Sequence, residues 1–211
     1  MGQSYTVQQG DHISGIAETF GFADYNNIWN DPANADLAGK RDNPHVLFPG
    51  DVLFIPDKQQ KWEDAATTLV HIFQLGAPPL KIRLVLKDFD GEPLANVDCT
   101  LEVAGVESQL TTDSTGLIEA TVPPSAKEGT LKVPDLDLEI PVSIGELDPV
   151  DQKSGWMMRL INLGYLDGEV DESDQALVRS AIEEFQCDQK LPVTGDADDA
   201  TVQKLKDVHG S

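Results

Sequence analysis

The sequence predicts a multi-domain α+β chain. Two strand-like segments flank two helical ones near the N-terminus, apolar residues alternate at a period of two in the middle, and they recur at helical spacing towards the C-terminus. A chain of 211 residues suits two or three small domains better than one. We expect a small βααβ domain at 1–57, a linker at 58–66, an antiparallel β-sandwich at 67–146 and an all-α three-helix domain at 147–211.

Charge restricts the partners of the chain. It has 15 Lys and Arg against 37 Asp and Glu, a formal net charge of −22. Nucleic acids and anionic membranes are bound through basic residues, so we expect no nucleic acid and no membrane as partner. Neutral or basic partners fit this charge best.

The expected place of synthesis is the cytoplasm. No segment has the apolar length of a membrane span, and no signal peptide precedes the strand-like residues that begin at Tyr5. Cys99 and Cys187 fall in different segments, so we expect buried, reduced thiols and no disulfide. If such a protein acts outside the cytoplasm, we expect it to leave by a route other than general secretion.

The first segment shows strand, helix, helix and strand signals in that order. Ile13, Ile16, Ala17 and Phe20 form one helical face, for which Asp11 or Ser14 is the expected N-cap. Further along, the sequence indicates a short helix at 24–30, a polar loop at 31–44, and a strand after the Pro-Gly turn at 49–50, with Leu53 and Ile55 facing the core.

This segment resembles a LysM domain. The resemblance rests on Tyr5-Thr6-Val7, Gly10-Asp11, Ile13, Ile16-Ala17 and the closing Pro49-Gly50-Asp51-x-Leu53-x-Ile55-Pro56. It implies a shallow groove for N-acetylglucosamine units of peptidoglycan or a chitin-like oligosaccharide. The implied groove has a first wall of Gly10, Asp11, His12 and Ile13, and a second wall of Asn43, Pro44, Val46 and Leu47. The alternative is a LysM fold kept as a spacer or docking module.

The middle segment alternates strictly. Leu80, Ile82, Leu84 and Leu86 point to one face, and further strands are expected at 98–103, 108–112, 117–122, 129–133 and 136–142. Together with Asp88-x-Asp90-Gly91-Glu92 and Thr112-Asp113-x-x-Gly116, this pattern resembles immunoglobulin-like, carboxypeptidase-regulatory-like β-sandwiches. The acidic residues are explained by a hairpin turn, so we expect no calcium or other metal.

The last segment predicts three helices. They are expected at 155–165, ended by Gly164, at 173–189, burying Leu177, Ala181, Ile182 and Phe185, and at 198–208, with Val202 and Leu205 inward. Leu163-Gly164-Tyr165, Phe185-Gln186 and Thr194-Gly195 make the segment similar to the three-helix peptidoglycan-binding domain. The resemblance offers Asn162, Tyr165, Asp171 and Gln186 as candidates for a second glycan site.

Binding, and not catalysis, is the function that we predict. The four histidines are scattered and form no ligand motif, neither cysteine has a nucleophile signature, and no residues remain for a catalytic domain, so we expect no enzyme and no cofactor. The order of the segments resembles proteins of type VI and related contractile secretion systems, which implies delivery to the periplasm and a spike or effector protein as partner. One alternative is a protein-interaction adaptor, chaperone or structural component of that apparatus that uses the same folds without glycan binding. Another is a hydrolase fragment.

Overall fold

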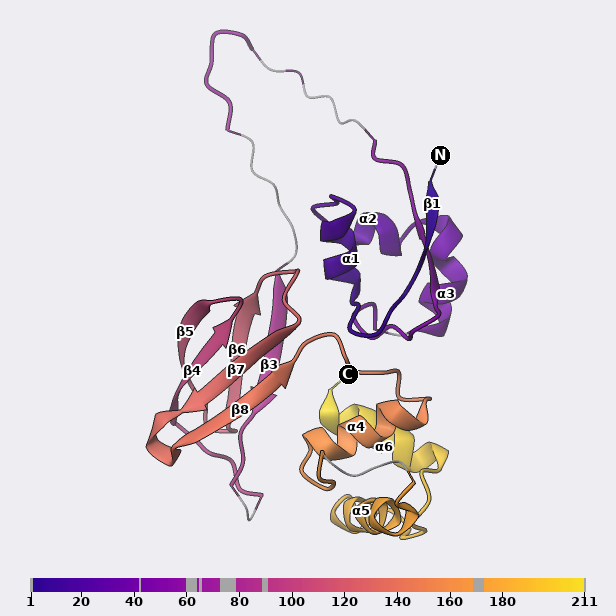
Figure 1. Cartoon of the computed structure of the whole chain (residues 1–211), viewed down its shortest axis with the longest axis vertical. Helices are drawn as coiled ribbons and strands as arrows, with labels where there is room; N and C mark the ends of the chain where they lie inside the picture. Colours follow the sequence, from indigo (N-terminus) through magenta and orange to yellow (C-terminus); the bar gives the residue numbers. More distant parts are fainter. Residues whose placement is uncertain are drawn as a thin grey trace.

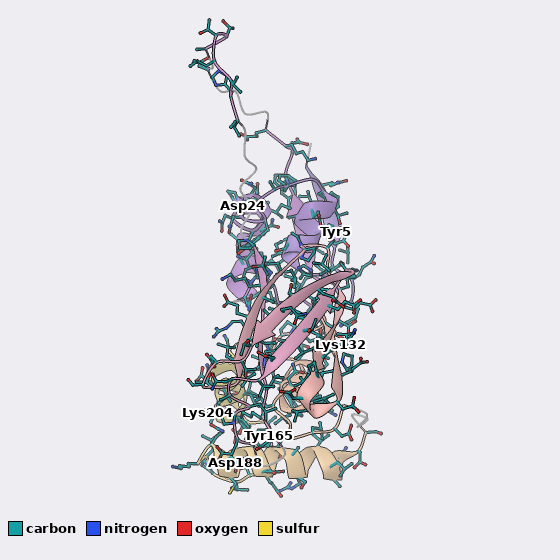
Figure 2. The ribbon with its side chains drawn as sticks, turned by 90° about the vertical axis from the view of Figure 1, so that its left-hand side faces the viewer. Tyr5, Asp24, Lys132, Tyr165, Asp188 and Lys204 are labelled. Carbon is teal, nitrogen blue, oxygen red and sulfur yellow. The ribbon has the colours of Figure 1, made fainter. Side chains whose placement is uncertain are left out.

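The computed structural model describes residues 2–41, 43–59, 64, 66–72, 79–88, 91–168 and 173–210. The molecule has three parts (Figure 1; Figure 2): an N-terminal part, a middle part of strands and a helical part. In Figure 1 the N-terminal part lies above the helical part, and the strands lie to the left of the helical part. Each part has its own hydrophobic cluster. The mixed α+β fold class is confirmed, whereas the boundaries at 57, 66 and 146 stay predictions.

The N-terminal part is built on one antiparallel strand pair. β1 (Gln3–Thr6) pairs with β2 (Val52–Ile55), and α1 (Ile13–Thr19) and α2 (Asn26–Trp29) lie between them in the chain. Leu53 and Ile55 face the core as predicted, with exposed fractions of 0% and 3%. The predicted N-cap of α1 is wrong: His12 Nδ1 accepts the Gly15 amide hydrogen, because the Asp11 carboxylate is engaged elsewhere.

The predicted loop at 31–44 is also wrong. It contains a 3-10 turn, η1 (Pro32–Asn34), and a helix, α3 (Ala35–Lys40). The Asn34 side chain donates to the carbonyls of Ile28 and Phe54, each at 2.8 Å, and accepts from the Phe54 amide at 2.7 Å. This buried amide joins α2 to β2, so residues that are polar in sequence serve the interior of the fold.

The middle part consists of two antiparallel sheets around one core. Ile118 and Ala120 of the first sheet and Leu101 and Leu131 of the second belong to the same buried cluster. The expected strands are confirmed within two residues at each end. The first sheet pairs β3 (Leu80–Val85) with β6 (Leu117–Val122), and the second has the order β5 (Val106–Thr111), β4 (Asp98–Val103), β7 (Glu128–Val133) and β8 (Leu138–Ser143).

The turn after β3 accounts for the described acidic residues there. The Asp88 amide donates to the Glu92 carbonyl, and the Glu92 amide donates to Asp88 Oδ1, both at 2.9 Å. Asp90 lies outside the described residues. Residues 66–72, before β3, are exposed throughout.

The helical part contains α4 (Lys153–Asn162), α5 (Gln175–Asp188) and α6 (Asp199–His209). Gly164 ends the first helix with φ +85°, as expected. Leu177 was predicted to be buried but is 52% exposed, and Val178 takes its place. The reason is periodicity, since Val178, Ile182 and Phe185 are spaced for one helical face and Leu177 lies about 100° away from it. Cys99 is buried as expected, but Cys187 is exposed, which corrects that prediction.

Buried arginines connect the parts. Arg159 Nη1 donates to the carbonyls of Asp148 at 2.9 Å and Gly155 at 2.7 Å, so it ties α4 to the segment that leaves the middle part. Arg41, at the end of α3, lies 3.5 Å from the Asp151 carboxylate of the same connection. None of the helices in the described ranges is long and apolar enough to cross a membrane.

Candidate functional site

The first wall is a rigid turn after β1. Gly10 adopts φ +79°, a conformation that glycine reaches without strain. Asp11 Oδ2 then accepts hydrogen bonds from the Tyr5 hydroxyl at 2.7 Å and from the Gln8 amide at 2.9 Å. Burial and the adjacent Asp11 raise the pKa of Tyr5 to about 12, so the hydroxyl keeps its proton for this bond. The turn is therefore held by side chains as well as by its backbone.

His12 is a buried, neutral member of the first wall. Its side chain is almost fully enclosed, with 3% of the residue exposed, and burial lowers its pKa, against the effect of a hydrogen bond to the Ala126 backbone. Because Nδ1 accepts from the Gly15 amide at 3.3 Å, the ring proton belongs on Nε2. In this tautomer one imidazole both caps α1 and contacts the middle part.

The second wall meets the first at two histidine rings. Asn43 Oδ1 accepts from the His45 amide at 2.9 Å, and Val46 and Leu47 are buried beneath this turn. The His45 ring lies edge-on to Tyr25 at 5.0 Å and 6.5 Å from the His12 ring, measured between centroids. Burial, and then the proximity of His12, lowers the pKa of His45.

A buried ion pair between Arg41 and Asp51 lies next to the second wall. Arg41 donates from Nε to Asp51 Oδ2 at 2.9 Å and from Nη2 to Oδ1 at 3.0 Å. Asp51 Oδ2 also accepts the Phe48 amide at 3.0 Å. Burial by itself would raise the pKa of Asp51, but these hydrogen bonds and the charges of Arg41 and Lys40 outweigh it, and the pKa lies below its usual value.

The structure thus brings both predicted walls together, yet leaves little of them exposed. Asp11, Asn43 and Pro44 are partly accessible. The other five candidates are buried: Gly10, His12, Ile13, Val46 and Leu47.

The middle part covers the His12 side of the groove. A Cβ atom on Gly145 would come within 2.8 Å of His12 Cδ2 and 3.0 Å of the Gly10 carbonyl oxygen. A Cβ atom on Gly15 would lie 3.2 Å from the Pro124 carbonyl oxygen and 3.4 Å from His12 Nε2. Two short segments, 123–127 and 144–146, therefore pack closely against the first wall.

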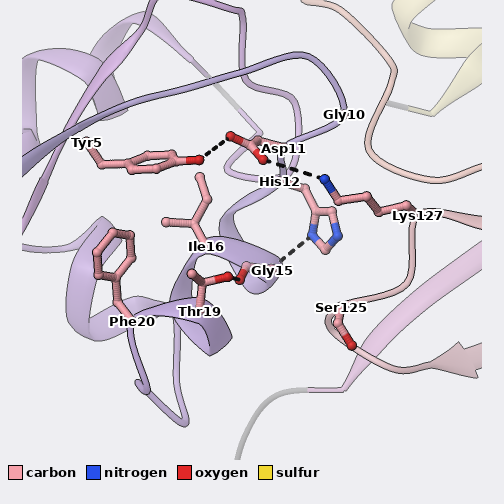
Figure 3. Close-up of a pocket in the computed structure, with 10 residues that line it drawn as sticks. All are labelled: Tyr5, Gly10, Asp11, His12, Gly15, Ile16, Thr19, Phe20, Ser125 and Lys127. Carbon is pink, nitrogen blue, oxygen red and sulfur yellow. Dashed lines mark hydrogen bonds and ion pairs between the residues drawn. The ribbon is translucent and has the colours of Figure 1, made fainter.

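A pocket of about 110 Å³ opens beside this contact (Figure 3). Lys127 of the middle part extends towards the first wall, and Ser125 lines the pocket with its hydroxyl directed away from Lys127 in this view. The N-terminal part contributes Tyr5, Gly10, Asp11, His12, Gly15, Ile16, Thr19 and Phe20. Tyr5, Ser125 and Lys127 were not among the predicted site residues. No pattern in the sequence indicates that residues 125–127 approach residues 5–20.

The candidates for the second glycan site are dispersed over the helical part. Asn162 Nδ2 lies 3.1 Å from His209 Nε2, and the Tyr165 hydroxyl donates to Asp188 at 3.0 Å. Gln186 is fully buried, so its side chain holds the neighbouring loop from the inside and is not available to a ligand at the surface. Its amide contacts Thr194, Gly195, Asp196 and Thr201. Asp171 lies outside the described residues.

Wall hydrolases use a zinc site, a pair of carboxylates or an activated cysteine. Among the described residues, no group of three or more His, Cys, Asp or Glu is arranged to hold a metal ion. Burial, followed by the charge of Asp98, raises the pKa of Cys99, which disfavours its thiolate form.

Comparison with protein families identifies both ends of the chain. Residues 5–31 match the LysM domain family, and residues 158–205 match the family described as "Putative peptidoglycan binding domain". Comparison with curated proteins and with solved structures found no match. The LysM match includes the first wall and ends before the second. The chain therefore carries a LysM domain at its N-terminal end and a peptidoglycan-binding domain at its C-terminal end, which supports a role in binding peptidoglycan.

Proposed function

We propose that this protein is a non-catalytic peptidoglycan-binding protein that engages the glycan through both ends of the chain. The observation that carries the proposal is the presence of two different wall-binding domains, at 5–31 and 158–205. Both matched families are families of binding domains. Two weak sites on one chain raise avidity on a repetitive polymer, because the second contact forms at a high effective concentration.

The setting that we propose is a type VI or related contractile secretion system, with delivery to the periplasm. The support for this setting is the order of the segments, a LysM domain, a strand-rich middle and a helical peptidoglycan-binding domain. A spike or effector protein would then be the second partner. Capture of such a protein by the tagged full chain, from cells that carry the system, tests the setting separately from glycan binding.

Co-sedimentation with isolated peptidoglycan sacculi tests the proposed function. We expect the full chain to pellet with sacculi, and the Gly10→Trp variant to pellet less because the indole distorts the first wall. Gly105→Trp is the matched control: Gly105 also has a positive φ, +75°, but lies in the β4–β5 turn with open space around it. Absence of pelleting by the unmodified chain would contradict the proposed function.

A protein-interaction role is the second candidate, and one observation favours it. The His12 side of the LysM groove is already covered by residues 123–127 and 144–146, as in a domain used for docking. The net charge of −22 would suit a basic partner. Salt-sensitive capture of one protein, together with no binding to sacculi, would favour this role over glycan binding.

A further inference from the structure

The pocket between the LysM domain and the middle part differs from the groove that the LysM resemblance implies. It contains part of the first wall, but its other side is α1 and residues 125–127, and no second-wall residue lines it. Figure 3 shows the Lys127 side chain extending from the middle part towards Asp11. The pocket therefore exists only where two parts of the chain meet.

Its polar groups can bind an anion. The Lys127 ammonium is 4.0 Å from Asp11 Oδ1, which is beyond hydrogen-bond distance, and the Lys127 side chain is 67% exposed. Its N–H donors are therefore available to a ligand. The Ser125 hydroxyl has no hydrogen-bond partner among the described residues. Asp11 Oδ2 is occupied by Tyr5 and Gln8, so the carboxylate is largely engaged within the turn.

The opposite side of the pocket is apolar. Tyr5 and Phe20 pack edge to face with ring centroids 5.4 Å apart, and Ile16 lies beside them. Thr19 donates its hydroxyl hydrogen to the Gly15 carbonyl at 2.9 Å and keeps an acceptor site. A ligand group here would meet carbon on one side and N–H and O–H donors on the other, an arrangement typical of small-molecule sites.

The size of the pocket restricts what enters it. A volume of about 110 Å³ corresponds to about four water molecules at about 30 Å³ each. The pocket can therefore hold one substituent of a sugar, while the sugar ring stays outside at the pocket entrance. An anionic substituent gains more binding energy here than a neutral one, because Lys127 provides a positive charge. The net charge of −22 repels anions from the rest of the chain.

We propose that this pocket binds a carboxylate-bearing substituent of an amino-sugar glycan, with Lys127 pairing the carboxylate and the apolar side of the pocket contacting the carbon atoms of the substituent. The inference rests on the proposed peptidoglycan-binding function. In that polymer the carboxylate has two sources, the lactyl group of a muramic sugar whose peptide stem has been removed, and the carboxyl groups of the stem itself. The pocket would make the protein selective for muramic units over plain N-acetylglucosamine oligomers.

Titration of the full chain with three probes tests the proposal. The probes are N-acetylmuramic acid, N-acetylmuramyl dipeptide and an uncharged chitin trisaccharide. Each probe is titrated into the unmodified chain and into three variants, Lys127→Met, Lys127→Arg and Lys132→Met. Lys132 is the matched control, because it lies on β7 paired with Glu102 and its removal changes the net charge by the same amount. An exposed charge pair is worth up to about 1 kcal/mol, so we expect Lys127→Met to weaken binding of the carboxylate probes about fivefold.

Each outcome decides the proposal. Weaker binding of both carboxylate probes in Lys127→Met alone, with Lys127→Arg near wild type and the trisaccharide unchanged, supports the pocket with either carboxylate as its ligand. A loss confined to N-acetylmuramic acid supports the pocket and assigns the lactyl carboxylate, because that carboxyl is an amide in the dipeptide. A loss confined to the dipeptide probe supports the pocket and assigns the stem carboxylate. Equal effects of Lys127→Met and Lys132→Met, or no binding of either carboxylate probe, overturn the pocket even if the protein still pellets with sacculi. Failure of the unmodified chain to pellet would instead overturn the proposed function.

Discussion

Replacing Arg41 with methionine removes the cation of the buried ion pair beneath the second wall. The side chains of Arg41 and Asp51 are 2% and 6% exposed, and two hydrogen bonds of 2.9 and 3.0 Å join them. Methionine fills much of the volume, so the main effect is a buried carboxylate that keeps one hydrogen-bond donor, the Phe48 amide, and the half-exposed Lys40 ammonium 3.8 Å away. Loss of one partner from a buried pair costs about 3–5 kcal/mol, and we expect about 3 kcal/mol here because that amide remains.

The loss should depend on pH in a defined direction. In the unmodified protein the pKa of Asp51 is below its usual value, so the pair stabilises the fold above the unfolded pKa of about 4 and loses this effect as the pH falls through the folded pKa. In Arg41→Met, burial favours the protonated acid. The difference in stability between the two proteins should therefore be largest near neutral pH and shrink below about pH 4.

Amide hydrogen exchange in the β1–β2 ladder measures this effect on the LysM domain alone. Four residue pairs of that ladder, from Gln3–Ile55 to Thr6–Val52, report its opening. Arg83→Met is the control, because Arg83 is 65% exposed and 3.9 Å from Glu119, and we expect a change within about 0.5 kcal/mol. A loss below about 1 kcal/mol in Arg41→Met, or one that does not vary with pH, would refute the assignment of a buried, stabilising pair.

Three further predictions concern the other parts. Gln186→Leu should destabilise the helical part by about 2–4 kcal/mol, because the buried Gly195 amide and neighbouring groups lose their partner; unchanged exchange of the α5 amides would contradict this. Burial, followed by the charge of Arg159, lowers the pKa of His209 to about 4. The helical part should therefore lose up to about 3 kcal/mol of folding stability as the pH falls from 6.5 towards 4. His209→Gln should flatten this pH dependence in a series of thermal melts. Gly145→Val should separate the LysM domain from the middle part, because its Cβ would clash with His12, and small-angle scattering should show a larger radius of gyration; an unchanged radius would speak against this contact.

Local sequence patterns anticipated most of the fold. Alternation of apolar residues identified the strands of the middle part, and the Pro-Gly turn placed Leu53 and Ile55 in the LysM core. Such patterns succeed because a strand or helix must place its apolar side chains on one face. They failed for residues 31–44, where no apolar period marks α3, because a tertiary hydrogen-bond set around Asn34 stabilises the segment.

The candidate site was anticipated only in part. The turn residues of the first wall follow from sequence, because the positive φ of Gly10 and the side-chain bonds of Asp11 are local requirements. The role of His12 as a cap was missed, since histidine is not among the preferred N-cap residues. For Gln186 the residue type indicates a polar contact, but only the packing of α5 shows that its partners are buried.

The sequence by itself determined the two segments that match the LysM and peptidoglycan-binding families, the strand-rich middle and the strong negative charge, because these depend on residue types and short spacings. Tertiary structure alone decided that the first wall faces the middle part and that Lys127 and Ser125 meet α1 at a pocket. These contacts join residues more than one hundred positions apart, as between Gln9 and Glu146, and depend on how separately folded surfaces pack. No local periodicity encodes that packing, so it could be learned only from the folded chain.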